Sequence, residues 1–326
     1  MRFRTPRTAL VTAAVATFVL AWASTGHTDD GKPGEVSIMP RWKVGERQRY
    51  ERVKTRRKTQ GKMSAKASGR GPIDVSVVEA GEKGYLVRWR IGETTDDNPR
   101  AAADPLTQAM NRLTVGLEVD LEIDNEATIT GVRNWAEMKS SGQKIAETLI
   151  QAQQAAGTDA KTLGAVRSTV EGLFATKERV EQLFAKEPQL FFVPIGRTYP
   201  GVGKAVEYDD QLPNPLGGPP FPCTGKFTLT SYDADKGRAE VSWTQTVDPK
   251  EAARIMLETL KAIAQRSGRI PPGADELKAL TVEDRAEFVI DTRTGWVETL
   301  THTRTTKTRG GSQEDILSMS RQSLPR

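Results

Sequence analysis

Three landmarks occur twice in this sequence in the same order, and they constrain its fold more than any other feature. The first is a Val-Gly pair followed, after four residues, by Tyr and an acid, at Val44–Glu51 and Val202–Asp209. The second is a strand pattern, a Lys-Gly turn and a second strand that ends in tryptophan, at Trp89 and at Trp243. Because glycine accepts a positive φ without a Cβ clash, both segments are typical of β-hairpins.

The third landmark is an Ile-Asp pair, a short turn and a returning strand, with the aspartate at Asp124 and Asp291. Aspartate accepts hydrogen bonds from the backbone that follows it, so we expect both residues to cap turns. The distance from the Lys-Gly turn to the tryptophan differs by one residue between the copies, which predicts a β-bulge in one of them. The shared order predicts an internal repeat of two β-meanders. The alternative is that unrelated meanders resemble each other by chance.

Helical patterns interrupt and separate the two copies. An Asp-Pro pair starts a helix in each copy, at Asp104-Pro105 and Asp248-Pro249, because aspartate is a good N-cap and proline suits the first helical position. Between the copies, apolar residues recur every three or four positions, which predicts two helices separated near Gly157 and ended by Pro188. Sequential hairpins favour antiparallel pairing. The predicted fold is therefore α+β: two related antiparallel curved sheets, each with a helical insert, joined by a central helical hairpin.

The first residues have the pattern of a cleaved export signal. Three arginines precede an uncharged run that ends at Ala21-Trp22-Ala23, a small-x-small pattern accepted by signal peptidase. The apolar run is shorter than the roughly 20 residues of a spanning helix, and an uncleaved membrane anchor is the alternative. We expect a periplasmic or secreted mature protein that does not span the membrane.

These patterns divide the chain into six parts. Its roughly 300 mature residues are enough for a sizeable hydrophobic core. The predicted parts are a signal peptide at 1–23, a flexible lead at 24–40, a first β-rich repeat at 41–134, a helical hairpin at 135–187, a second β-rich repeat at 188–310 and a C-terminal tail at 311–326.

The segment from Arg47 to Arg70 is strongly basic. Alternating residues such as Tyr50 and Val53 favour an exposed strand and hairpin, and a solvated hairpin is the first interpretation. The second is binding to an anionic surface such as lipopolysaccharide, phospholipid head groups or teichoic acid. Signal cleavage removes three of the five net positive charges of the chain. The nearly balanced mature chain argues against nucleic acid as a partner.

Residues suited to catalysis or metal binding are scarce. The chain has one cysteine, Cys223, and of its two histidines only His302 lies in a predicted folded part. A Cys223–His302 pair would define a cysteine-dependent hydrolase, the remote alternative, but no nucleophile-turn pattern flanks the cysteine. Zinc needs closely spaced His, Cys or carboxylate ligands, and the sequence has no such cluster. We expect no enzyme activity, no cofactor and no metal.

A proline-rich segment from Leu212 to Thr224 occurs in the second copy only. Alternating prolines fix φ and remove backbone donors, which predicts an ordered loop rather than a helix or a central strand. Its apolar residues Leu216, Phe221 and Cys223 are the candidates for contact with a ligand or a partner. A loop packed back onto the body is the alternative.

The export signal, the Val-Gly-x4-Tyr opening and the later Ile-Asp turn together resemble secreted bacterial proteins built from repeated β-meanders. The pattern of strands with helices on one face is also similar to lipoprotein-carrier open barrels, from which the long helical segment departs. That similarity implies a concave sheet that binds acyl chains. The predicted function is a non-enzymatic exported envelope protein that binds a hydrophobic or amphipathic ligand, such as a lipid, or an envelope protein. A purely structural or protein-interaction module is the alternative.

Overall fold

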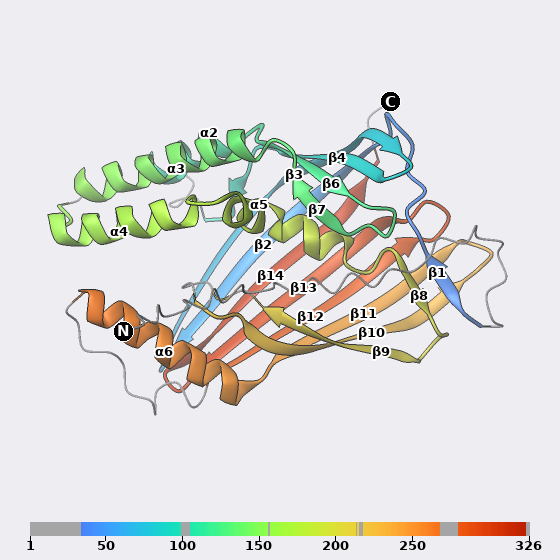
Figure 1. The fold of residues 1–326 in the computed structure, drawn as a ribbon. Helices are drawn as coiled ribbons and strands as arrows, with labels where there is room; N and C mark the ends of the chain where they lie inside the picture. The colour runs from blue at the N-terminus through green and yellow to red at the C-terminus, as the bar shows by residue number, and fades with distance from the viewer. Residues whose placement is uncertain are drawn as a thin grey trace, which may run out of the picture.

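The computed structural model describes residues 34–98, 105–155, 157–212, 214, 218–267 and 280–323. The predicted signal peptide, most of the predicted lead and Leu216 lie outside these residues. The described part consists of one large antiparallel sheet, a two-stranded sheet and helices (Figure 1).

Twelve strands form the large sheet. They are β2 (Arg47–Gln60), β3 (Met63–Gly81), β4 (Gly84–Ile91), β5 (Thr95–Asp96), β6 (Glu118–Ile123), β7 (Ile129–Val132), β9 (Ala205–Leu212), β10 (Phe221–Asp233), β11 (Arg238–Val247), β12 (Thr281–Asp291), β13 (Trp296–Thr308) and β14 (Gly311–Gln322). Their order across the sheet is β7-β6-β4-β3-β2-β14-β13-β12-β11-β10-β9, and the short β5 pairs with β3.

The strands of both predicted repeats form one continuous sheet, so the prediction of two sheets was wrong. β14 pairs on one side with β13 and on the other with β2, from Gly311–Gln60 to Gln322–Arg49. It therefore joins the first half of the chain to the second. The predicted C-terminal tail was wrong for the same reason, because residues 311–322 are this joining strand.

The repeated tryptophans lie at matching places in the sheet. Trp89 on β4 and Trp243 on β11 each belong to the second strand of a hairpin. Both hairpins carry a register shift, at Val77/Glu79 and at Leu229/Ser231. A bulge therefore occurs in both copies, where the spacing predicted it in one.

The two aspartates of the third landmark cap turns, as predicted. The Asp124 carboxylate accepts hydrogen bonds from the backbone N–H groups of Glu126 and Thr128 at 2.9 and 2.8 Å. The Asp291 carboxylate accepts one from the backbone of Arg293 at 3.0 Å. Both residues direct the chain from one strand into the next.

The helices are α2 (Pro105–Thr114), α3 (Trp135–Ala155), α4 (Ala160–Leu173), α5 (Lys177–Phe192) and α6 (Pro249–Ser267). The prolines predicted to start α2 and α6 do so, and Asp248 caps α6 by accepting from the backbone of Lys250 and Glu251 at 2.8 and 3.0 Å. The central segment contains three helices rather than a two-helix hairpin. The extra boundary lies at Thr176, whose hydroxyl caps α5.

Pro188 does not end a helix, because α5 continues through it to Phe192. A proline inside a helix costs about 3 kcal/mol. The next turn buries Phe191 and Phe192 completely against the sheet, and two buried phenylalanines contribute about 3–6 kcal/mol. Burial therefore outweighs the lost backbone hydrogen bond.

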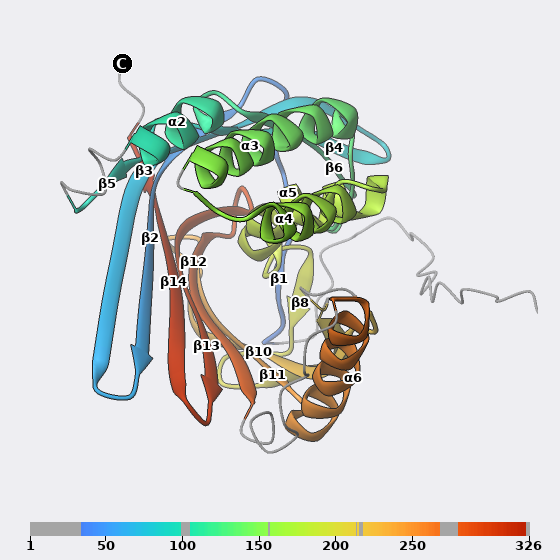
Figure 2. The same cartoon turned by 90° about the vertical axis from the view of Figure 1, so that its left-hand side faces the viewer.

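The sheet is strongly curved, and α5 and α6 pack against its concave side (Figure 2). The core lies between α5 and the sheet, where Phe191 contacts the rings of Tyr50 and Trp89. A two-stranded sheet of β1 (Val36–Ile38) and β8 (Arg197–Tyr199) adds to this core, with Ile38 fully buried. The end of the predicted flexible lead is thus an ordered strand. None of the described helices is both long and apolar enough to cross a membrane.

Candidate ligand-binding site

Two separate hydrophobic clusters lie on the concave face of the sheet. The large cluster lies between the sheet and α5 and includes Trp243, Ala286 and Leu317. The small cluster lies between the sheet and α6. It consists of Phe221, Cys223, Val247, Ala252, Ile255 and Leu280.

A row of polar side chains separates these clusters, and we call it the charged row. It consists of Asp315, Arg304, Asp284 and Gln245, which are cross-strand partners on β14, β13, β12 and β11. On β11, Trp243 of the large cluster lies two residues before Gln245, and Val247 of the small cluster lies two residues after it. The charged row is therefore a boundary within one face of the sheet.

Asp284 is the centre of the charged row, with only 1% of its surface exposed. Its carboxylate accepts two hydrogen bonds from Arg304, at 2.8 and 2.9 Å, and lies 2.7 Å from Nε2 of His302. Burial alone would raise the pKa of Asp284, but the hydrogen bonds from His302 and Arg304 outweigh it and hold the pKa below its usual range. Asp284 is therefore ionised at neutral pH.

Helix α5 adds a positive and a negative charge beside the charged row. Glu187 accepts a hydrogen bond from Arg52 at 3.3 Å and contacts the ammonium group of Lys54. The Lys186 side chain as a whole is exposed, yet its ammonium end lies near the charged row, where burial and the charge of Arg304 lower its pKa. Among the described residues, no carboxylate forms an ion pair with Lys186. It is thus a cation available to an added anion.

An aromatic ladder crosses the strands next to the charged row. The rings of Tyr208, Phe227, Trp243 and His302 stack with centroid separations of 5.5, 6.2 and 6.0 Å. The Trp243 indole N–H donates to the Tyr208 hydroxyl at 2.7 Å. The Tyr208 ring covers Gly225, where a Cβ would lie 2.2 Å from a ring atom. Only glycine at this position leaves room for the ring, so the sequence itself holds the ladder in place.

Two of the three candidate residues predicted from the proline-rich segment lie in a strand rather than on a loop. Leu216 lies outside the described residues, whereas Phe221 and Cys223 lie in β10 and are each only 4% exposed. Pro222 fits into this strand because it lies near the beginning of β10, before Cys223 and Val247 form the first residue pair with β11. Phe221 and Cys223 therefore line the small cluster under α6.

The pair required for a cysteine-dependent hydrolase does not form. Cys223 is on β10 and His302 on β13, with β11 and β12 between them, which separates them by at least about 14 Å across the sheet at roughly 4.8 Å per strand. Burial first, and then the charge of Asp210, raise the pKa of the Cys223 thiol to about 11. The thiol is protonated at neutral pH, and its cross-strand neighbour is the carboxylate of Asp210 rather than the required histidine.

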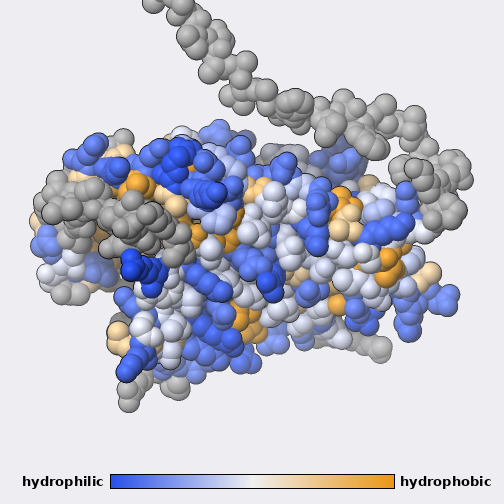
Figure 3. All heavy atoms as spheres, turned by 90° about the horizontal axis from the view of Figure 1, so that it is seen from below, coloured by the Kyte–Doolittle hydropathy of each residue, from blue (hydrophilic) through white to orange (hydrophobic). Residues whose placement is uncertain are grey.

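A shallow pocket of about 550 Å³ opens at the edge of the sheet and reaches the small cluster. Its lining includes Asp210, Gln211, Cys223, Val247 and Pro249. The face of the molecule seen in Figure 3 is mostly hydrophilic, with hydrophobic residues in small separate groups. The small cluster under α6 therefore offers a ligand more apolar contact than that surface does.

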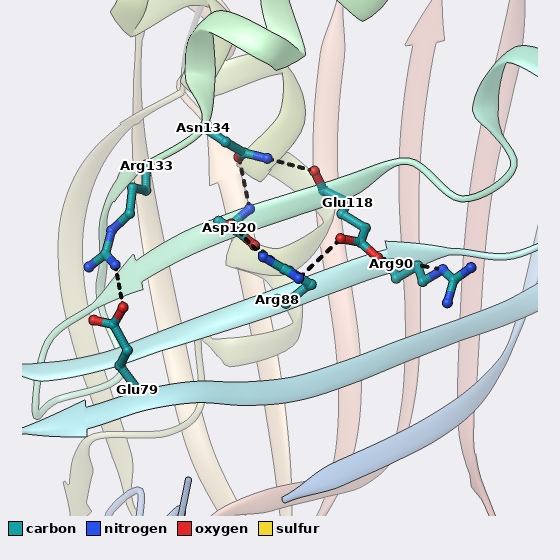
Figure 4. Close-up of polar contacts among 7 residues, drawn as sticks. All are labelled: Glu79, Arg88, Arg90, Glu118, Asp120, Arg133 and Asn134. Atoms are coloured by element: carbon teal, nitrogen blue, oxygen red, sulfur yellow. Dashed lines mark hydrogen bonds and ion pairs between the residues drawn. The ribbon is translucent and has the colours of Figure 1, made fainter. Parts of the chain in front are cut away.

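A second polar network braces the other side of β4 and β6 (Figure 4). Arg88 donates to Asp120 at 2.7 and 2.9 Å and forms an ion pair with Glu118 at 3.2 Å. The Asn134 side chain bonds the backbone of Glu118 and Asp120, and so fixes the start of α3 to β6. Because the carboxylates of Glu118 and Asp120 are both paired, this network is structural.

The sequence analysis considered His302 but missed Asp284 and Lys186. Charged residues in strands and helices usually face solvent, so neither stood out. A signal was present in β12, where Asp284 is in phase with Ala286, Phe288 and Ile290 on the buried side. A single carboxylate within such an alternating apolar series indicates a buried, paired charge.

Comparison with known proteins gives no family for this chain. No family model matches it, and no curated protein matches it. A solved structure described as "Lipid-protein interactions in lipovitellin" is similar over 87% of this chain and 26% of that chain, with 8% sequence identity and a TM-score of 0.41. This chain thus corresponds to about a quarter of that one. A likeness at this level carries no argument about function.

Proposed function

We propose that this protein is an exported, non-enzymatic envelope protein that binds an amphipathic ligand on the concave face of its sheet. The apolar part of the ligand occupies the small cluster under α6, and an anionic head group binds Lys186 and Arg304. The observation that carries the proposal is the charged row, which borders the small cluster on the same face. The export part rests on the basic, apolar and Ala-x-Ala pattern of the first 23 residues.

Helix α6 is a suitable cover for a ligand because it contributes little to the core. Its fully buried apolar residues in the small cluster are Ala252 and Ile255, and displacing them costs a few kcal/mol. An acyl chain gains about 0.8 kcal/mol for each buried CH₂ group. A chain of ordinary lipid length therefore gains more than the opening costs, while the large cluster continues to hold the sheet.

The charges near the row favour an anionic head group. Burial first, and then the cations Arg304 and Lys54, lower the pKa of Lys186. The carboxylates of Asp284 and Asp315 raise this pKa, but Lys186 forms no ion pair among the described residues. An added anion would relieve this repulsion and form charge-assisted hydrogen bonds, which contribute about 1.5–3 kcal/mol each. We therefore expect acidic amphipaths to bind more tightly than neutral ones.

The sole cysteine supplies the test of this proposal. Because Cys223 lies in the small cluster, a ligand there should slow its alkylation by a neutral maleimide in proportion to occupancy. We expect saturable protection by lysophosphatidylglycerol and weaker protection by monoacylglycerol, which lacks the negative charge. Lys186→Gln should weaken lysophosphatidylglycerol binding about tenfold and leave monoacylglycerol unchanged.

The matched control is Lys177→Gln, an exposed lysine on the same helix that pairs with Glu181. It should leave protection by both amphipaths unchanged. Equal protection by the two amphipaths in the wild type, or no protection at all, would contradict the proposal. The latter result would favour the alternative of a structural or protein-interaction module.

A further inference from the structure

Two hairpin tips that are far apart in the sequence lie side by side in the structure. The β2–β3 hairpin turns at Gly61-Lys62, and the β13–β14 hairpin turns at Arg309-Gly310. They are neighbours because Gln60 of β2 pairs with Gly311 of β14. Figure 2 shows both hairpins extending in the same direction, past α2, α3, α4 and α5.

These tips form a surface that we call the basic end. It consists of the exposed side chains of Lys58, Lys62, Met63, Lys66, Lys307 and Arg309. Farther from the tips, arginines are neutralised, as in the ion pairs Arg56–Asp315 at 2.5 Å and Arg57–Glu314 at 3.5 Å.

Most cations of the basic end are not neutralised in this way. Within the described part of the chain, no carboxylate forms an ion pair with Lys58, Lys62, Lys307 or Arg309. The charge of Lys66 helps to lower the pKa of Asp97, but the two side chains form no ion pair there. The basic end therefore concentrates positive charge on a chain whose 47 basic and 42 acidic residues give a net charge of only +5.

Met63 adds an apolar group to this cationic surface. It lies next to the β2–β3 turn and is 71% exposed, the largest exposed fraction among the large hydrophobic residues described. An apolar side chain surrounded by cations suits a bilayer interface, where the cations bind lipid head groups and the apolar group enters the acyl boundary. A soluble polyanion would use the cations and leave Met63 in water.

We propose that the basic end docks the protein on an anionic phospholipid bilayer. The small cluster lies on the same side of the charged row as the hairpin tips, since β12 begins beside Lys307. Docking therefore brings the cover helix α6 towards the lipid surface. The proposal rests on the two tips alone and holds whether or not a ligand binds under α6.

The test is flotation of the full mature chain with vesicles of phosphatidylcholine alone and of phosphatidylcholine mixed with phosphatidylglycerol. We expect binding to the acidic vesicles only, and release of the protein by high salt. Each cation at such a surface contributes about fivefold to the partition coefficient. The variant K58Q/K62Q/K307Q/R309Q should therefore bind at least about tenfold more weakly.

A matched variant removes the same charge at the opposite ends of the strands. Its substitutions are at four exposed lysines, K43Q/K83Q/K204Q/K236Q, and it should bind within about twofold of the wild type. Met63→Ser should weaken vesicle binding several-fold but leave binding to heparin unchanged. Equal binding to neutral vesicles, no vesicle binding, equal loss in the two fourfold variants, or an unchanged Met63→Ser variant would each overturn the proposal.

Discussion

Ending the chain after Arg309 is expected to prevent the sheet from folding as one unit. This truncation removes β14, the strand between β13 and β2. A central strand of this length makes on the order of 20 backbone hydrogen bonds, which together contribute roughly 10 kcal/mol or more. That loss is similar to the whole stability of an ordinary domain. Urea unfolding followed by circular dichroism should show no cooperative transition at the wild-type midpoint.

A chain ending after Ser323 is the control, because it keeps every residue of β14. It should unfold with the wild-type midpoint and slope. A peptide covering residues 310–323, added during refolding, should restore part of the lost transition by occupying the vacant place in the sheet. An unchanged midpoint in the shorter chain would show that β14 does not join the two halves.

Asp284→Asn is expected to cost about 3–5 kcal/mol of unfolding free energy. The amide keeps the shape of the side chain but leaves the Arg304 guanidinium without its carboxylate. The matched control is Asp315→Asn, since Asp315 pairs with Arg56 at a more exposed place in the same row. That change should cost no more than about 1 kcal/mol. Similar costs for the two variants in urea unfolding would contradict a buried ion pair at Asp284.

The same carboxylate predicts a pH dependence. The pKa of Asp284 is lower in the folded protein than in the unfolded chain, where the pKa of aspartate is about 3.9. Its stabilising contribution is therefore complete above that value and is lost as the pH falls through the lower, folded pKa. The stability difference between wild type and Asp284→Asn should accordingly shrink below about pH 4. If the stability difference between the two proteins stayed constant down to roughly pH 2, titration of Asp284 would not be its cause.

Features encoded by neighbouring residues could be predicted from the sequence. The Lys-Gly turns, the caps at Asp124 and Asp291 and the start of α6 at Pro249 each depend on a few adjacent residues, and each is present. Turn and cap preferences are local, so no knowledge of the partner strands was needed.

Features that depend on distant partners were missed. Nothing near Leu317 and Met319 indicates that this segment pairs with β2, more than 250 residues earlier. Proline usually ends a helix, but at Pro188 the packing of Phe191 and Phe192 outweighs this local preference. The role of Asp284 depends on Arg304 and His302, which the next strand, β13, places beside it. The candidate site depends mainly on such pairings, so the sequence located Phe221 and Cys223 but not their surroundings.

The most direct test of the account is native mass spectrometry of the protein recovered from an exporting host. The proposal predicts a folded chain carrying an acidic, acyl-chain amphipath that is released when the protein unfolds. Ile255→Asn, within the small cluster, should lose this ligand, whereas Arg254→Asn, on the exposed side of α6, should retain it. A folded wild-type protein with only the mass of its own chain would contradict the proposed function.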